Sequence, residues 1–209
     1  MTVSRTRVFQ GIGDALNIVG GNKVNPAQWD DLSSQGFATR VDTTTGRIGF
    51  DYDDIAVFFA SNARYAATEQ YSVAPQTFHR QKVGANIFPH IHWLQNQNAE
   101  PNWLIEYRVY ENGGSPGSYT PVASEGTVFT YSSGTIMQIS TFGEIDMSSI
   151  TGVSATIDLK LYRDAANDST LFSGADPYTG NALLKFFDLH VQIDAAGSNS
   201  QFTKGGPYG

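Results

Sequence analysis

Apolar and polar side chains alternate along residues 103–110 and 153–163, with the two-residue period of a β-strand. One face of each stretch is apolar and contains the branched aliphatic and aromatic side chains that favour strands. The opposite faces carry charged residues: Glu106 and Arg108 in the first stretch, and Asp158 and Lys160 in the second. Each stretch is therefore predicted to be a strand with one face in a hydrophobic core and the other toward polar surroundings.

Residues 182–194 show the same alternation near the C-terminal end of the chain. The side chains predicted to face the core are Leu183, Phe187, Leu189, Val191 and Ile193, and those opposite them are Asp188, His190 and Gln192. This stretch is predicted to be the last strand of the fold.

Further apolar runs, separated by turns rich in Gly, Asn, Asp and Ser, predict additional strands. They cover residues 37–41, 47–52, 55–60, 68–73, 76–82, 86–94, 122–131 and 135–145. A short helix is predicted to start at Asn25, with Pro26 in its first position, and to include Trp29. A parallel sheet needs crossover helices that this pattern lacks, so the predicted fold is all-β: an antiparallel β-sandwich, specifically a jelly roll.

The turn pattern divides the chain into three parts. Residues 1–34 contain several glycines and are predicted to form an extended N-terminal arm or a peripheral segment that lies on another part of the structure. Residues 35–196 are assigned to the sandwich domain, and residues 197–209 to a polar, glycine-rich tail. No internal repeat is detected, and both the arm and the tail are expected to contact neighbouring subunits.

Composition narrows the range of functions. The net charge is −7, and the 13 Lys and Arg residues are scattered, which argues against a nucleic-acid partner. Because there is no cysteine, disulfide frameworks and thiolate metal sites are excluded. No apolar run approaches the ~18 residues of a membrane helix, and charges interrupt residues 1–19, so we expect neither a membrane partner nor a signal peptide. The protein is expected to be made in a cytoplasm.

Residues 86–93 contain two of the chain's four histidines. His90 and His92 are two positions apart, so a strand would place both imidazoles on the same face. Neutral imidazole pairs suit Zn, Ni, Fe or Cu, and His190 or His79 could supply a third ligand. Alternatively, three such pairs could meet on the axis of a cyclic trimer.

A structural network accounts for the same histidines without a metal, because buried polar groups in proteins are paired. The predicted members of this shared polar face are His90, His92, Glu106, Arg108, Asp158, Lys160, Asp188 and His190. We favour this interpretation. We therefore expect no cofactor and no catalytic residue, and we keep the metal site as the alternative.

The aromatic residues allow two interpretations. The 10 Tyr, 3 Trp and 13 Phe could line a sugar-binding groove, but most occupy strand positions with apolar neighbours. Four tyrosines in or beside loops are candidates for a subunit interface: Tyr119, Tyr131, Tyr178 and Tyr208. Hydrolytic activity has no supporting motif, since there is no Gly-x-Ser-x-Gly sequence.

Several short segments, in their order along the chain, resemble a group of tailed-bacteriophage structural proteins. They are residues 29–32, 89–93 (Pro-His-Ile-His-Trp), 103–107 (Trp-Leu-Ile-Glu-Tyr), 142–146, 161–163, 178–184 and 188–204. Residues 78–80 look like a variant of a segment that precedes the His-x-His strand in that group, with Phe78 in place of a proline.

This resemblance implies a non-enzymatic component of a phage virion, made in the host cytoplasm. The first expectation is a jelly-roll head-decoration (cement) protein that binds the major capsid protein or other virion proteins, commonly as a trimer. The second is a neck, collar or tail component. A carbohydrate-binding module and a metal-dependent enzyme are more remote alternatives.

Overall fold

The computed structural model describes residues 18–19, 22–23, 28–34, 40–41, 45–51, 53, 56–77 and 79–193. Its strands are β1 (Ile18–Val19), β2 (Asn22–Lys23), β3 (Gln28–Ser34), β4 (Arg40–Val41), β5 (Ile48–Asp51), β6 (Ala56–Phe59), β7 (Gln70–Val73), β8 (Phe88–Gln95), β9 (Trp103–Tyr110), β10 (Thr120–Thr127), β11 (Ile136–Phe142), β12 (Thr156–Arg163) and β13 (Ala182–Ile193). All pairings between these strands are antiparallel, which confirms the predicted all-β class. The predicted tail lies outside the described residues, as does most of the predicted arm.

The eight strands from β6 through β13 pair according to a simple rule. β6 pairs with β13, β7 with β12, β8 with β11, and β9 with β10. The chain thus forms one long antiparallel ribbon that turns back between β9 and β10. Rolling up this ribbon gives the observed strand orders β6-β13-β8-β11 and β7-β12-β9-β10. These are the two four-stranded sheets of a jelly roll, as the sequence predicted.

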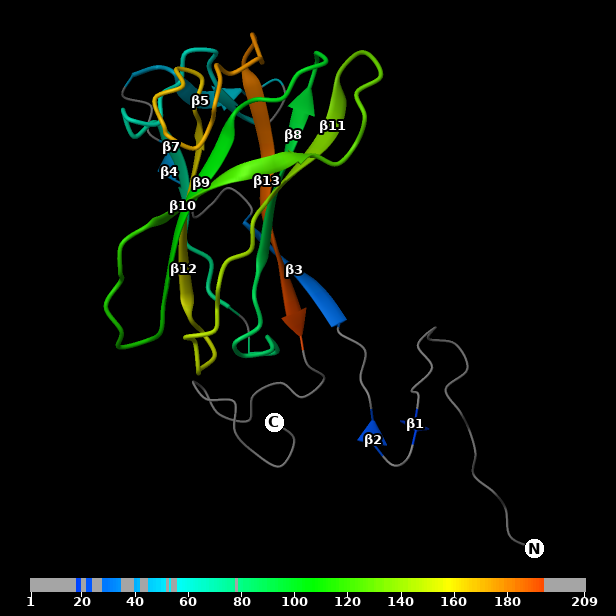
Figure 1. Ribbon diagram of the computed structural model, residues 1–209, viewed down its shortest axis with the longest axis vertical. Helices are drawn as coiled ribbons and strands as arrows, with labels where there is room; N and C mark the ends of the chain where they lie inside the picture. The colour runs from blue at the N-terminus through cyan, green and yellow to red at the C-terminus, as the bar shows by residue number, and fades with distance from the viewer. Residues whose placement is uncertain are drawn as a thin grey trace, which may run out of the picture.

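We name each sheet by its two central strands. The β8–β13 sheet is extended by β5 beside β6 and by β3 beside β13, and the β9–β12 sheet is extended by β4 beside β7. Figure 1 shows the two sheets as the two layers of the molecule, with β10 crossing between them. The first half of β10 pairs with β9 and the second half with β11, and a bulge lies between Ser124 and Gly126. Gly126 has φ +125°, a backbone conformation that residues other than glycine rarely adopt.

The hydrophobic core lies between the two sheets. Every second side chain of β8 and β9 points inward, including Ile91, Trp93, Trp103 and Ile105, all of which are fully buried. The rings of Trp93 and Trp103 meet edge to face, with centroids 6.1 Å apart, so these two strands contact each other across the core. This contact establishes that the remaining side chains of β8 and β9 point away from each other, on opposite sides of the molecule.

The helix predicted from Asn25 is wrong, because residues from Gln28 onward form the strand β3. β3 pairs with residues 187–193 of β13, which continue beyond the part of β13 that pairs with β6. The backbone groups along this edge of β13 need partners, and pairing with them outweighs the local capping signal. β3 therefore lies in the range assigned to the arm but belongs to the sheet.

No described residue lies in a helix long and apolar enough to cross a membrane.

The alternation predicted for the last strand fails at one point. The register between β13 and β8 shifts between Leu184 and Phe186, where a bulge inserts an extra residue. Leu184 is consequently buried, whereas Leu183, predicted to face the core, is only half-buried. From Phe187 onward the predicted alternation holds. The strand predicted for residues 76–82 is replaced by isolated bridges at Gln76 and Gln81.

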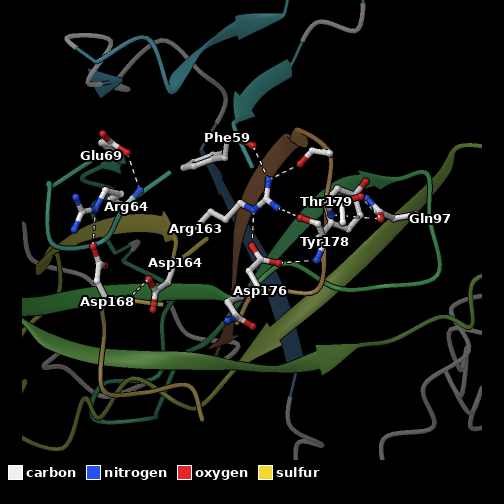
Figure 2. Close-up of polar contacts among 12 residues, drawn as sticks. Phe59, Arg64, Glu69, Gln97, Arg163, Asp164, Asp168, Asp176, Tyr178 and Thr179 are labelled. Carbon is white, nitrogen blue, oxygen red and sulfur yellow. Dashed lines mark hydrogen bonds and ion pairs between the residues drawn. The ribbon is translucent and has the colours of Figure 1, made fainter. Parts of the chain in front are cut away.

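The long loop after β12 is fixed by a buried arginine. Arg163 is fully buried, and its Nε donates to Asp176 Oδ2 at 2.6 Å. Its Nη1 donates to the carbonyl oxygens of Phe59 at 3.0 Å and Gly180 at 2.6 Å, and its Nη2 donates to that of Tyr178. Figure 2 shows the guanidinium group at the centre of these partners. One cation thus joins β6, β12 and the loop that leads into β13.

Candidate functional site on the outer face of one sheet

The structure does not bring the eight residues of the predicted polar face together. His90, His92, Asp188 and His190 lie on the outer face of the β8–β13 sheet, whereas Glu106, Arg108, Asp158 and Lys160 lie on the outer face of the β9–β12 sheet. Because the sheets pack through their inner faces, these outer faces point in opposite directions. The single shared face is therefore corrected to two. Alternation distinguishes inward from outward side chains, but it does not say to which sheet a strand belongs.

On the β9–β12 sheet, oppositely charged residues face each other across neighbouring strands. Arg108 lies opposite Asp158, with its Nη2 and Nε at 2.6 Å and 2.7 Å from Asp158 Oδ2. Lys160 lies opposite Glu106, with Nζ at 3.4 Å from Oε2. Each charge on this group of four has a partner of the opposite sign, so the set is neutral.

Three tyrosines complete this network. The hydroxyl groups of Tyr65 and Tyr162 each donate to Glu106 at 2.8 Å. Burial and the hydrogen bond to Glu106 raise the pKa of Tyr65 to about 12, and the same two causes raise the pKa of Tyr162. The ring of Tyr119 lies 3.7 Å from Lys160 Nζ, at the distance of a cation–π contact. The four charged side chains of this face therefore all have partners within the chain.

The β8–β13 sheet carries a different arrangement. Its register places Asp188 directly opposite His90, with His92 one pair further along. Asp188 Oδ2 lies 3.2 Å from His92 Nε2 and 3.7 Å from His90 Nε2. Asp188 is 9% exposed, and its second oxygen, Oδ1, is buried without a hydrogen-bond partner. A buried carboxylate oxygen of this kind is costly, so it marks the site as unusual.

Ring contacts hold the imidazoles in place. The ring centroids of His90 and His190 are 4.3 Å apart, and those of His90 and His92 are 5.1 Å apart. Phe186, which the bulge of β13 turns outward, meets His92 edge to face at 5.9 Å. We call His90, His92, Asp188 and His190 the histidine cluster. Within the part of the chain that the structure describes, it contains the one set of His, Asp or Glu residues that could bring three ligand atoms within 4.8 Å of one another: His90, His92 and Asp188.

Large apolar side chains surround the histidine cluster. Phe88 is 39% exposed, Phe186 41% and Met137 43%, and they come from three neighbouring strands, β8, β13 and β11. None of these three residues was predicted to be functional. The position of Phe88, two residues before His90, could have placed it on this face, but the bulge that exposes Phe186 leaves no clear sequence signal. Exposed apolar side chains that gather on one face are typical of an interaction surface.

The candidate interface tyrosines have different positions. Tyr178 is corrected from interface to core, because it is 1% exposed, packs against Trp93 and donates its hydroxyl hydrogen to Asn96 Oδ1 at 2.8 Å. Tyr119 and Tyr131 are half-buried. The hydroxyl of Tyr131 lies 3.0 Å from the carbonyl oxygen of Asn96, inside the same subunit. Tyr208 lies outside the described residues.

His79, considered as a third metal ligand, is not part of the histidine cluster. Its Nε2 lies 3.0 Å from Ser154 Oγ, and Ser154 has φ +64°. This pair lies beside the loop that precedes β12. The histidine that does join His90 and His92 is His190, through its ring contact with His90.

A surface hollow of about 350 Å³ lies between the loop after β8 and the end of β10. Phe129 and Tyr131 are among the residues that line it, which makes it the natural place to look for a sugar-binding groove. However, Glu100 Oε1 accepts hydrogen bonds from the backbone nitrogen and the hydroxyl of Thr127, and Gln95 is bonded to Ala99 and Gln138. These polar groups already hydrogen-bond the loops to each other. We therefore consider the hollow a weaker candidate for a functional site than the histidine cluster.

Comparisons with known proteins leave the family open. No family model matches the chain, and no curated protein matches it. Among solved structures, the chain is similar to TmCBM61 in complex with beta-1,4-galactotriose, with 12% sequence identity and a TM-score of 0.27, over 77% of this chain and 86% of that chain. A TM-score this low carries no argument. The jelly-roll assignment therefore rests on the strand order described above.

Proposed function

We propose that this protein is a non-enzymatic structural component of a tailed-bacteriophage virion, and that it decorates and stabilises the head. The observation that carries the proposal is the outer face of the β8–β13 sheet, where exposed apolar side chains surround the histidine cluster. Such a face is expected to be covered by another protein, because the free energy falls when exposed rings of this size are removed from water.

The ordered resemblance to phage structural proteins supports the proposal. Two of its segments lie in the centre of the fold: residues 89–93 in β8 and residues 103–107 in β9. Both strands contribute tryptophans to the core, and the first also contributes two members of the histidine cluster. A chain that shares these segments is expected to share the sandwich and the character of its outer face. Because fold alone does not imply function, the exposed face remains the principal support.

Docking by this face suits a rigid body. A two-layer sandwich loses little conformational entropy when it binds, so the ordering cost offsets only a small part of the favourable interface free energy. The head surface gains stability by mass action, because a protein that binds only the assembled shell favours that shell. We propose a homo-oligomer, a trimer, whose partners are the major capsid protein or other virion proteins. The arm and tail would reach neighbouring subunits.

The test is the copy number and location of this chain in particles of the phage that encodes it. Quantitative mass spectrometry should find hundreds of copies per particle, and added protein should raise the temperature at which heads lacking it are disrupted. A dozen or fewer copies at the neck would favour the neck, collar or tail alternative over a head-decoration protein. Absence from purified particles would overturn the virion role altogether.

A further inference from the structure

We propose that His90, His92 and Asp188 form a binding site for one divalent first-row transition-metal ion, with Zn²⁺ as the first candidate. The site would lie on the outer face of the β8–β13 sheet. This inference rests on the local geometry and does not depend on the virion role.

The backbone brings the three side chains together. His90 and His92 are two residues apart on β8, so both point outward, and Asp188 lies opposite His90 on the neighbouring strand. Two central strands of a sheet vary little in their spacing, because each is hydrogen-bonded on both sides. The ligand atoms are therefore carried by one of the more rigid parts of the fold rather than by loops.

The distances between the donor atoms suit a metal ion. Zn²⁺ bonded to nitrogen and oxygen at about 2.0–2.2 Å in tetrahedral geometry places neighbouring ligand atoms about 3.3–3.5 Å apart. Asp188 Oδ2 lies 3.2 Å from His92 Nε2 and 3.7 Å from His90 Nε2, and the three ligand atoms lie within 4.8 Å of one another. Small side-chain rotations would equalise these separations around an ion, without a change in the backbone.

The environment of Asp188 favours a bound cation. Its side chain is 12% exposed, and its Oδ1 has no hydrogen-bond partner. Burying a carboxylate is costly unless a cation or several donors compensate its charge. A divalent ion next to Oδ2 would supply this compensation, and the two imidazoles would then bind as neutral ligands.

The donor set indicates which ions would bind. Two imidazole nitrogens with one carboxylate suit Zn²⁺, Fe²⁺, Co²⁺ and Ni²⁺, whereas Mg²⁺ and Ca²⁺ prefer ligand sets made of oxygen. The rings of His190 and Phe186, packed against His90 and His92, restrict the orientation of the two ligands. Three protein ligands leave at least one coordination position, which water or a group from a bound partner would fill.

Titration calorimetry on the full chain, freed of metal with a chelator, tests this proposal with Zn²⁺ as the probe. We expect one ion per chain, and visible d–d absorption of a tetrahedral site when Co²⁺ is used in place of Zn²⁺. Asp188→Asn, which keeps the shape of the side chain, and His92→Ala should each weaken binding by about 100-fold. His79→Gln is the matched control, since His79 lies beside Ser154, and should bind Zn²⁺ like the unchanged protein.

Two results would overturn the proposal. One is the absence of both heat and d–d absorption in the unchanged protein. The other is Zn²⁺ binding that Asp188→Asn and His92→Ala leave intact, which would place the ion elsewhere on the chain. Circular dichroism shows whether each variant is folded, and Asp188→Asn alone suffices if His92→Ala does not fold.

Discussion

The outer faces of the two sheets are built on the same backbone plan and have opposite chemistry. On the β9–β12 sheet, Glu106, Arg108, Asp158 and Lys160 pair across the strands, and tyrosines use the remaining acceptors. On the β8–β13 sheet, the imidazoles of His90 and His92 share one carboxylate, Asp188, His190 packs against His90, and exposed apolar rings lie around them. The charged side chains of the first face are all paired within the chain. The second face carries exposed apolar side chains and a buried carboxylate oxygen, Asp188 Oδ1, that has no hydrogen-bond partner.

This difference separates stability from binding. Changes on the β9–β12 face should lower the free energy of unfolding and leave binding intact, whereas changes on the β8–β13 face should do the reverse. If both faces respond in the same way to comparable substitutions, the distinction between them fails.

Glu106→Gln should have the largest effect. The carboxylate accepts hydrogen bonds from Tyr65 and Tyr162 and pairs with Lys160, so its loss leaves a half-buried lysine without its counter-ion. We expect the free energy of unfolding to fall by about 2–3 kcal/mol, measured by urea denaturation. Binding to phage heads should be unchanged. A loss below about 0.5 kcal/mol would show that this face is not the stabilising one.

The double substitution Phe88→Ser with Phe186→Ser tests the other face. Both rings are about two-fifths exposed, so the free energy of unfolding should fall by less than about 1 kcal/mol. Head binding, measured by co-sedimentation, should weaken about 30-fold, as expected when ~2 kcal/mol of interface free energy is lost. Phe129, which is 54% exposed and lies on the hollow beside β10, provides the control: Phe129→Ser should bind normally.

The Arg108–Asp158 pair should contribute a smaller amount. Arg108 is 28% exposed, so solvent screens the pair, and we expect a coupling free energy of about 1 kcal/mol in a double-mutant cycle with Arg108→Gln and Asp158→Asn. The coupling should decrease as salt is added. A coupling near zero at low salt would mean that the tyrosines, not the ion pairs, stabilise this face.

Alkaline pH should weaken the β9–β12 face. The pKa of Tyr65 is raised from 10.0 to about 12 in the folded protein, so its contribution to stability is fully present below pH 10. That contribution is lost as the pH rises from 10 through 12, because only the unfolded chain ionises the hydroxyl readily. Ultraviolet titration should show that Tyr65→Phe removes one late-titrating tyrosine and flattens the loss of stability above pH 10.

Asp188→Asn should have the smallest effect on stability. In buffer containing a chelator, the free energy of unfolding should change by less than about 0.5 kcal/mol, or rise, because the substitution removes a buried charge whose Oδ1 has no hydrogen-bond partner. The matched change on the opposite face is Asp158→Asn, which should be destabilising. Urea denaturation of the two variants side by side gives the sharpest comparison of the two faces.

Parts of this fold were predictable from local pattern alone. The strands β9 and β12 have regular alternation, and the class and the jelly-roll topology followed from strand number and turn spacing. The helix predicted at Asn25–Pro26 failed because β3 is fixed by pairing with β13, a contact more than 150 residues away in sequence. The bulge between Leu184 and Phe186 could not be predicted either, because it depends on the register with β8.

The sequence predicted which residues of the candidate site point outward, but not how the outward polar residues are divided between the two sheets. Period-two alternation correctly placed His90, His92 and Asp188 outward, yet it also grouped them with Glu106 and Arg108, which lie on the other side of the molecule. Which strands share a sheet depends on how the ribbon rolls up. In the same way, the loop position of Tyr178 suggested exposure, whereas the hydrogen bonds of Arg163 draw its backbone into the interior.

The rolled ribbon also has a consequence for the order in which the protein is made and folded. Near the turn of the ribbon, Tyr107 pairs with Thr120, whereas at its far end Phe59 pairs with Ala182. Pairs distant in sequence form slowly, because a long loop must close before any contact compensates for the lost entropy. β13 follows all of its partners in the chain, because it pairs with β3, β6 and β8. The β8–β13 sheet therefore cannot be completed before β13 has been synthesised, and until then β8 has only β11 beside it.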